Sequence, residues 1–79
     1  MTLSILSPEN TFFNGDISLI QLPGIDGLFE VLPRHAPIVA TLAAGNIRIV
    51  EENGKETVLH IQGGVFEVVE GNRATVLTM

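Results

Sequence analysis

The residue types that could support catalysis are few in this sequence. It contains no cysteine and only two histidines, His35 and His60. A metal-dependent β-barrel enzyme would need two or three histidines with a carboxylate, and the nearest approximation here is His60 with Glu67. One histidine and one carboxylate are a weak signal. An ordinary solvent-facing strand position is therefore the favoured interpretation of His60.

Patterns for nucleophilic catalysis or phosphate binding are also incomplete. Ser4, Ser7 and Ser18 have no histidine or carboxylate at a spacing that suggests a catalytic triad. The glycines in Gly24-Ile25-Asp26-Gly27 and in Gly63-Gly64 lack the lysine and the helix start that a phosphate-binding loop uses. Turn glycines are the better interpretation, and we predict no catalytic residue, no metal site and no cofactor.

The segment from Gly27 to Pro37 is the strongest candidate for a binding element. A strand that carries Phe29 runs into His35, which lies between Pro33 and Pro37. The two prolines restrict the backbone and exclude both a helix and a central strand. Such a rigid surface loop could be a docking element. Composition alone favours the alternative, a tight corner of a sheet in which His35 bonds to the backbone.

Composition excludes several classes of function. Four Lys and Arg against nine Asp and Glu give a net charge of -5, so counterion release from a phosphate backbone has little to act on, and we expect no nucleic-acid partner. No run approaches the roughly 18 apolar residues of a membrane span, so we expect no direct membrane insertion. Hydrophobic residues make up 46% of the 79 and charged residues 16%, which predicts one folded domain over residues 1–79.

The elements that must position these residues are predicted to be strands. Glycine and proline divide the chain into short segments rich in β-branched and aromatic residues, and no segment has a helical period with caps. Residues 38–44 could be helix or strand by composition, and their short length favours a strand. The fold class is all-β, with two packed antiparallel sheets. The expected strands are residues 2–6, 17–22, 28–32, 38–44, 46–52, 55–62, 65–69 and 73–78.

Turns are predicted from local residue chemistry. Phe13-Asn14-Gly15-Asp16 and Pro23-Gly24 indicate turns. Asn53-Gly54 indicates a tight type I′ hairpin, because both residues tolerate a positive φ. Gly63-Gly64 indicates a bulge or a close approach of two backbones, and Glu70-Gly71-Asn72 a last hairpin turn.

The residues from Leu22 to Pro37 resemble a hallmark segment of the epsilon subunit of F-type ATP synthases, G-x-x-G-x-F-x-V-L-P-x-H-A-P. The resemblance extends over the whole chain. Further matching motifs, in the family's order, are Ser7-Pro8-Glu9, Phe13-x-Gly15, Ala44-Gly45 before Ile47-Arg48-Ile49, Gln62-Gly63-Gly64-Val65-Phe66-Glu67-Val68, and Asn72 through Val76-Leu77.

The resemblance implies a flattened antiparallel β-sandwich of about ten short strands. It implies a non-catalytic subunit of the central stalk, a rotor element that joins the gamma subunit to the polar loops of the c-subunit ring. We therefore expect it at the cytoplasmic face of the bacterial inner membrane, as a peripheral part of the ATP synthase. The resemblance covers the family's N-terminal half, so we expect no function of the C-terminal helical pair from these residues.

The resemblance and the residue chemistry together suggest two contact surfaces. Some family members have a glutamate where this chain has Leu28, so neighbouring carboxylates are candidates for that contact. The expected c-ring contacts are Asp26, Leu28, Phe29, Glu30 and His35. The segment around residues 38–48 is small and apolar, which suits a close approach of another protein. The expected gamma contacts are Ser7, Ala40, Leu42 and Asn46.

Two alternatives stay open at the level of sequence. One is a free-standing β-sandwich that binds other proteins without a rotor role. The other is a minimal metal-dependent β-barrel enzyme that uses His60 and Glu67.

Overall fold

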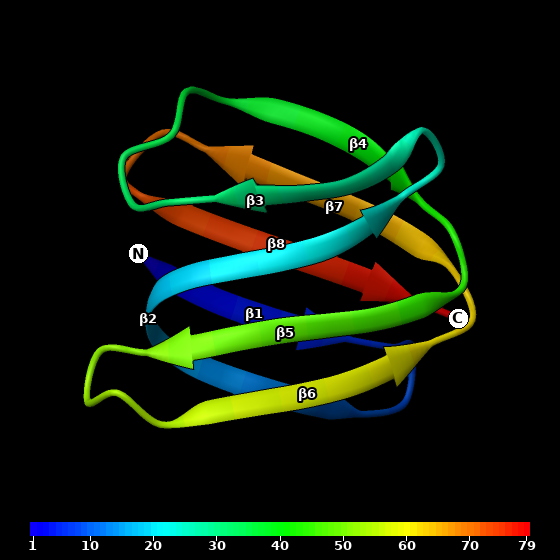
Figure 1. Cartoon of the computed structure of the whole chain (residues 1–79), viewed down its shortest axis with the longest axis horizontal. Coiled ribbons are helices and arrows are strands. Elements are labelled where there is room, and N and C mark those ends of the chain that lie inside the picture. Colours follow the sequence, from blue (N-terminus) through cyan, green and yellow to red (C-terminus); the bar gives the residue numbers. More distant parts are fainter.

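The computed structural model describes residues 1–79 and contains eight strands and no helix (Figure 1). The all-β class is confirmed, with eight strands where the resemblance implied about ten. No element is a helix of the length and apolarity that crossing a membrane would need. The strands are β1 (Thr2–Leu6), β2 (Thr11–Gly24), β3 (Gly27–Val31), β4 (Ile38–Leu42), β5 (Gly45–Glu51), β6 (Glu56–Ile61), β7 (Gly64–Val69) and β8 (Arg73–Thr78).

The strands form two layers that share β2, which has 14 residues. The first half of β2 pairs with β1, and the second half pairs with β5 and β3. The register of β2 with β5 shifts between Ile17 and Leu19, and this irregularity lies where β2 passes from one layer to the other. One layer is therefore β4-β7-β8-β1-β2, and the other is β3-β2-β5-β6 (Figure 1).

The core lies between the two layers. Successive side chains of a strand point to opposite faces, so the alternating aliphatic residues of each strand meet in the middle. Phe66 is the largest fully buried side chain, and the ring of Phe29 packs against it at 6.0 Å between centroids. Fifteen buried hydrophobic residues form one cluster: Met1, Leu3, Ile5, Ile17, Ile20, Leu22, Val31, Leu42, Ile47, Ile49, Ile61, Phe66, Val68, Ala74 and Val76.

Two predicted turns were wrong. The residues of Phe13-Asn14-Gly15-Asp16 lie inside β2, where Gly15 pairs with Leu3 of β1. The ladder with β1 satisfies the backbone hydrogen-bonding groups of these residues. Strand pairing therefore outweighs the local preference for a turn. Pro23-Gly24 also continues β2. The chain reverses at Ile25 and Asp26, because Gly24 pairs with Gly27 across the hairpin.

The β5–β6 connection is a hairpin, but not of the predicted type I′. That turn needs a positive φ at both central residues, whereas Gly54 has φ 90° and Asn53 has a negative φ. The amide of Gly54 donates to the carbonyl of Glu51 at 2.9 Å, and the amide of Lys55 donates to Asn53 Oδ1 at 2.9 Å. The connection is thus a longer turn that ends in a left-handed glycine.

Pairing within the layers is antiparallel except between β1 and β8, which run parallel. Residues 38–42 form a strand, as their composition favours. The close approach predicted at Gly63-Gly64 is confirmed at Gly64. A Cβ atom there would overlap the carbonyl oxygen of Leu77 on β8.

Candidate docking site

The structure divides the expected c-ring contacts between two ends of the molecule. Asp26 lies in the turn before β3, whereas His35 lies in the loop after it. Figure 1 shows this turn and this loop at opposite ends of β3. His35 Nδ1 is 2.6 Å from the carbonyl oxygen of Ala36, as in the sheet corner considered from the sequence. Asp26 and His35 therefore do not form one contact surface.

Within β3, neighbouring residues face opposite sides. Leu28 is 68% exposed on the outer face of its layer, and Glu30 is exposed on the same face. Phe29 points the other way and is half-buried against Phe66. Leu28 and Glu30 are thus available to a flat partner surface, but Phe29 is reached only from between the layers.

The expected gamma contacts are also scattered. Ser7 is half-buried between β1 and β2, and its hydroxyl accepts a hydrogen bond from the Asn10 amide at 3.2 Å. Leu42 is 4% exposed and belongs to the core, so its side chain cannot contact a partner. Asn46 is exposed at the start of β5, and its Oδ1 is 3.0 Å from Nδ1 of His60.

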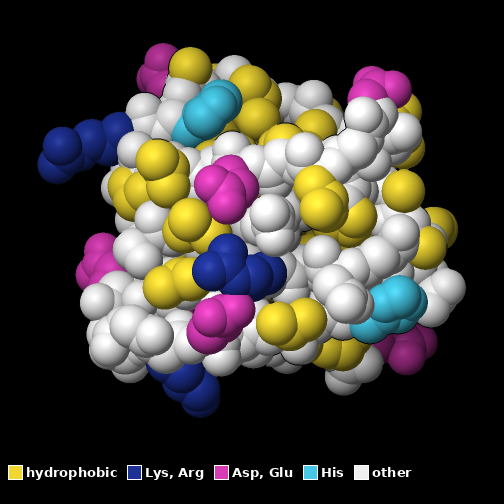
Figure 2. Space-filling model, viewed as in Figure 1, with side chains coloured by type: hydrophobic (Ala, Val, Ile, Leu, Met, Phe, Trp, Pro, Cys, Tyr) yellow, Lys and Arg dark blue, Asp and Glu magenta, His cyan; other side chains and the backbone are white.

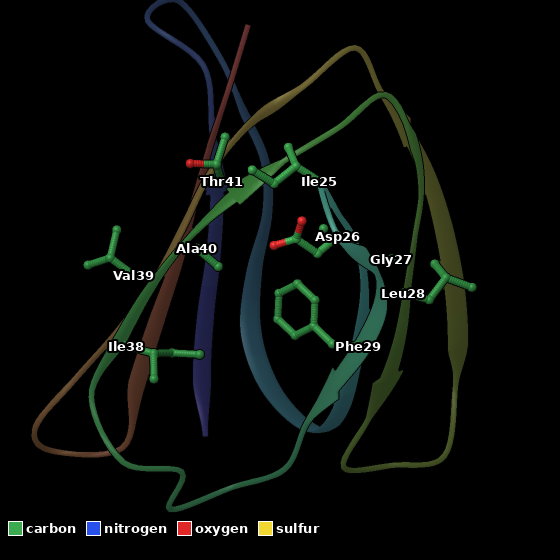
Figure 3. A pocket seen from close by; sticks show the side chains of 10 residues that line it. Ile25, Asp26, Gly27, Leu28, Phe29, Ile38, Val39, Ala40 and Thr41 are labelled. Carbon is green, nitrogen blue, oxygen red and sulfur yellow. The ribbon is translucent and has the colours of Figure 1, made fainter.

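Asp26, Phe29 and Ala40, assigned from the sequence to two different surfaces, line one groove of about 520 Å³. The groove lies between β3 and β4, and we call it the β3/β4 groove. Figure 3 shows Phe29 and Asp26 pointing into it from the β3 side and Ala40 from β4. Its other lining residues are Gly24, Ile25, Gly27, Leu28, Ile38, Val39 and Thr41.

Two backbone hydrogen bonds close one end of the β3/β4 groove. The amide of Ile25 donates to the carbonyl of Thr41 at 3.2 Å, and the amide of Ala43 donates to the carbonyl of Pro23 at 2.8 Å. The β2–β3 turn is thereby tied to the end of β4. The two surfaces expected from the sequence are in direct contact here.

Sequence reasoning identified Leu28 but missed two other strongly exposed apolar residues beside this groove. Val39 is 70% exposed and Ile25 is 63% exposed. An aliphatic residue in a turn is a signal that could have indicated Ile25. No comparable signal marks Val39. An aliphatic residue in a predicted strand is assigned to the core unless the position of the opposite layer is known.

Charged groups are sparse on the outer face of the β3-β2-β5-β6 layer. Figure 2 shows this face with separate hydrophobic patches between a few charged side chains. Arg48 and Glu56 form an ion pair of 2.6 Å between Nε and Oε1, with side chains 38% and 52% exposed. The carboxylate of Asp26 has no hydrogen-bond or ion-pair partner within the chain.

The geometry does not support the metal-enzyme alternative. His60 is on β6 and Glu67 on β7, in different layers, and both are exposed. His60 is engaged with Asn46 instead. No group of three or more His, Cys, Asp or Glu is placed to hold a metal ion.

These features define a small β-sandwich. Its β3/β4 groove and the exposed apolar residues beside it suit the binding of another protein. All 79 residues match the family model of the ATP synthase delta/epsilon chain, β-sandwich domain. The chain belongs to this family, and it is not itself catalytic.

Curated relatives agree over nearly the full chain. The chain is 44% identical over 77 residues to the ATP synthase epsilon chain of Chlorobaculum tepidum, covering 98% of this chain and 86% of that one. It is 41% identical to the ATP synthase epsilon chain of Chlorobium limicola, covering 96% and 85%. The ATP synthase epsilon chain of Leptospira interrogans is 37% identical, and the match spans 60% of that longer chain.

Solved structures share the fold. A chain of the Euglena gracilis mitochondrial ATP synthase superposes with a TM-score of 0.86 at 23% identity, over 96% of this chain and 48% of that one. A chain of the Tetrahymena thermophila mitochondrial ATP synthase, in a structure of its central stalk and c-ring, gives 0.82 at 18% identity, over 100% and 63%.

Proposed function

We propose that this chain is a non-catalytic rotor subunit of a proton-translocating F-type ATP synthase, which joins the ring of c subunits to the gamma subunit. The main observation behind the proposal is the match of all 79 residues to the β-sandwich domain of the ATP synthase delta/epsilon chain. The relatives above that are named ATP synthase epsilon chain support it. Because those relatives are bacterial, the expected location is the cytoplasmic face of the inner membrane.

The proposed contact with the c-ring is the exposed end of the β2–β3 hairpin. Leu28 offers apolar area, and Asp26 and Glu30 offer carboxylates to the polar loops of c subunits. The hairpin is short and its turn is hydrogen-bonded to β4, so little ordering entropy is lost when it docks. His35 is left out of this contact because it lies at the other end of β3.

The proposed contact with gamma lies at the end of the sandwich that includes Ser7 and Asn46, together with the part of β4 around Ala40. Leu42 is left out of this contact because it is buried. The two proposed contacts adjoin each other through the hydrogen bond between Ile25 and Thr41. Torque would therefore pass between them through a ladder of backbone hydrogen bonds and would not cross a flexible linker.

The experiment is reconstitution of membranes that hold an ATP synthase depleted of its epsilon subunit. Addition of the 79-residue chain should yield a complex that co-purifies with gamma and should restore ATP-driven proton pumping. A protein that binds neither gamma nor the c-ring under these conditions would be a free-standing interaction module, and the proposal would be wrong.

A further inference from the structure

The two layers of the sandwich meet at two open seams, and these differ in size. At one seam the edges of β3 and β4 flank the β3/β4 groove of about 520 Å³. At the other seam, β6 and the start of β2 flank a hollow of about 110 Å³. The volume of the β3/β4 groove lies within the range of typical ligand-binding pockets, whereas the volume of the second hollow lies well below that range.

The edge of β4 that faces the groove carries unpaired backbone groups. The carbonyl of Thr41 and the amide of Ala43 are hydrogen-bonded to the β2–β3 hairpin, so these two residues direct their backbone groups to this side. Backbone groups alternate between the two sides of a strand, so those of Val39 point the same way. No strand pairs with β4 beside Val39, since the β2–β4 ladder consists of the single pair Gly24 and Leu42. β3 pairs only with β2, so its opposite edge is free as well.

Natural proteins protect such edges with charges, prolines or covering segments. The edge strand β6 carries Glu56 and His60, both exposed, and follows Lys55. β4 has no charged residue, and its most exposed side chain is Val39 at 70%. β4 therefore has the features of a strand that is covered when the protein is in its working state.

The interior of the groove specifies the chemistry of what covers it. Phe29, Ile38 and Ala40 make its walls apolar, and Asp26 lies at one end (Figure 3). The Asp26 carboxylate has no partner in the chain. A strand that entered the groove would direct every second side chain inward. An apolar residue and a Lys or Arg two positions apart would meet the apolar walls and Asp26 together.

We propose that the β3/β4 groove binds an extended segment of a partner protein, which pairs with the free edge of β4 as an added strand. The segment has an apolar residue over Phe29 and Ile38, and a basic residue two positions away that pairs with Asp26. Main-chain hydrogen bonds supply affinity and the two inward side chains supply specificity, as in other cases of strand addition. The inference rests on the groove alone and does not depend on which subunit supplies the segment.

The test uses the full chain and a synthetic hexapeptide, blocked at both ends, with a valine and a lysine two positions apart. Binding should slow hydrogen exchange of the Val39 amide and leave the Val58 amide on β6 unchanged. A peptide with the same composition but with valine and lysine adjacent should bind several-fold more weakly, since one of the two side chains would face away. N-methylation of the peptide residues that pair with β4 should abolish binding without any change to the protein.

Variants of the protein test separately the ion pair with Asp26 and the main-chain pairing with β4. Asp26→Asn should weaken binding of the lysine peptide roughly 2- to 5-fold, as expected for one exposed ion pair. Val39→Pro should weaken it at least about 10-fold because the edge amide is removed, and Val58→Pro is the matched control on β6. Equal binding of the N-methylated peptide, protection at β6, or self-association of the chain through β4 would each overturn the proposal.

Discussion

The backbone amide of Arg34 donates a hydrogen bond of 2.7 Å to Oδ1 of Asn72, and these are the only two non-glycine residues with a positive φ. Arg34 (φ 67°) belongs to the β3–β4 loop, and Asn72 (φ 59°) to the β7–β8 turn. The bond joins two irregular segments that are 38 positions apart. Asn72 also accepts a backbone hydrogen bond from Thr2 at 3.0 Å, so three segments meet at this end of the sandwich.

Replacement of Asn72 should lower the free energy of unfolding by an amount that depends on the new residue. Asn72→Ala removes the acceptor for the Arg34 amide and keeps a side chain in a left-handed conformation, so we expect a loss of about 1–3 kcal/mol in the free energy of unfolding. Asn72→Gly loses the same acceptor but relieves the backbone, so its loss should be smaller. Urea unfolding measures both, and a greater loss in the glycine variant would contradict this account.

The contact between β7 and β8 at Gly64 should tolerate no side chain. Gly64→Ala would bring a Cβ atom against the backbone carbonyl of Leu77, which cannot move without breaking the ladder, so we expect a loss of about 3 kcal/mol or more. Gly54→Ala is the control. That glycine has φ 90° and open space around it, so its replacement should cost about 1–2 kcal/mol. Thermal unfolding that ranked Gly54→Ala as the worse variant would refute the steric argument.

Leu42 and Val39 test which face of β4 is available to a partner. Leu42 is 4% exposed, so Leu42→Ala should lower the free energy of unfolding by about 2–5 kcal/mol through loss of packing. Val39 is 70% exposed, so Val39→Ala should change stability by no more than about 0.5 kcal/mol. Chemical denaturation provides both values. Similar losses at the two positions would mean that the strand faces are assigned incorrectly.

Coupling to the c-ring should depend on the end of the β2–β3 hairpin. Leu28→Asp should reduce ATP-driven proton pumping in reconstituted vesicles strongly and leave the fold intact, because Leu28 is 68% exposed. Asp26→Asn combined with Glu30→Gln should reduce it modestly, because an exposed ion pair contributes only about 0.2–1 kcal/mol. The effect of the double variant should diminish as salt is added.

His35→Ala is the control for the coupling experiment. His35 lies at the opposite end of β3, so its replacement should leave pumping unchanged at every salt concentration. The hairpin end would not be the contact if pumping were reduced by His35→Ala and unaffected by Leu28→Asp. Circular dichroism of each variant separates a loss of coupling from a loss of folding.

The sequence by itself determined the family and the approximate position of most strands. Alternating aliphatic residues such as Ile47 and Ile49 predict a strand with one buried face, because side chains of a strand point to two sides in turn. The family resemblance rests largely on the prolines around His35 and the glycines of the hallmark segment. These residues can be recognised without the structure because proline and glycine set the local backbone conformation by their own chemistry. These signals are local and need no knowledge of the partner strands.

Only the tertiary structure decided which strands pair and which faces meet. The turn signal at Phe13–Asp16 failed because β1 pairs with these residues, and the parallel pair of β1 with β8 has no local signature. From the sequence, Phe29 and Leu42 are apolar residues that a partner could contact. In the structure the opposite layer partly covers Phe29 and buries Leu42. Asp26, Phe29 and Ala40 share a groove because β3 and β4 are the free edges of different layers. Pairing between distant segments depends on burial and hydrogen bonding across the whole chain, and these are not encoded in the spacing of neighbouring residues.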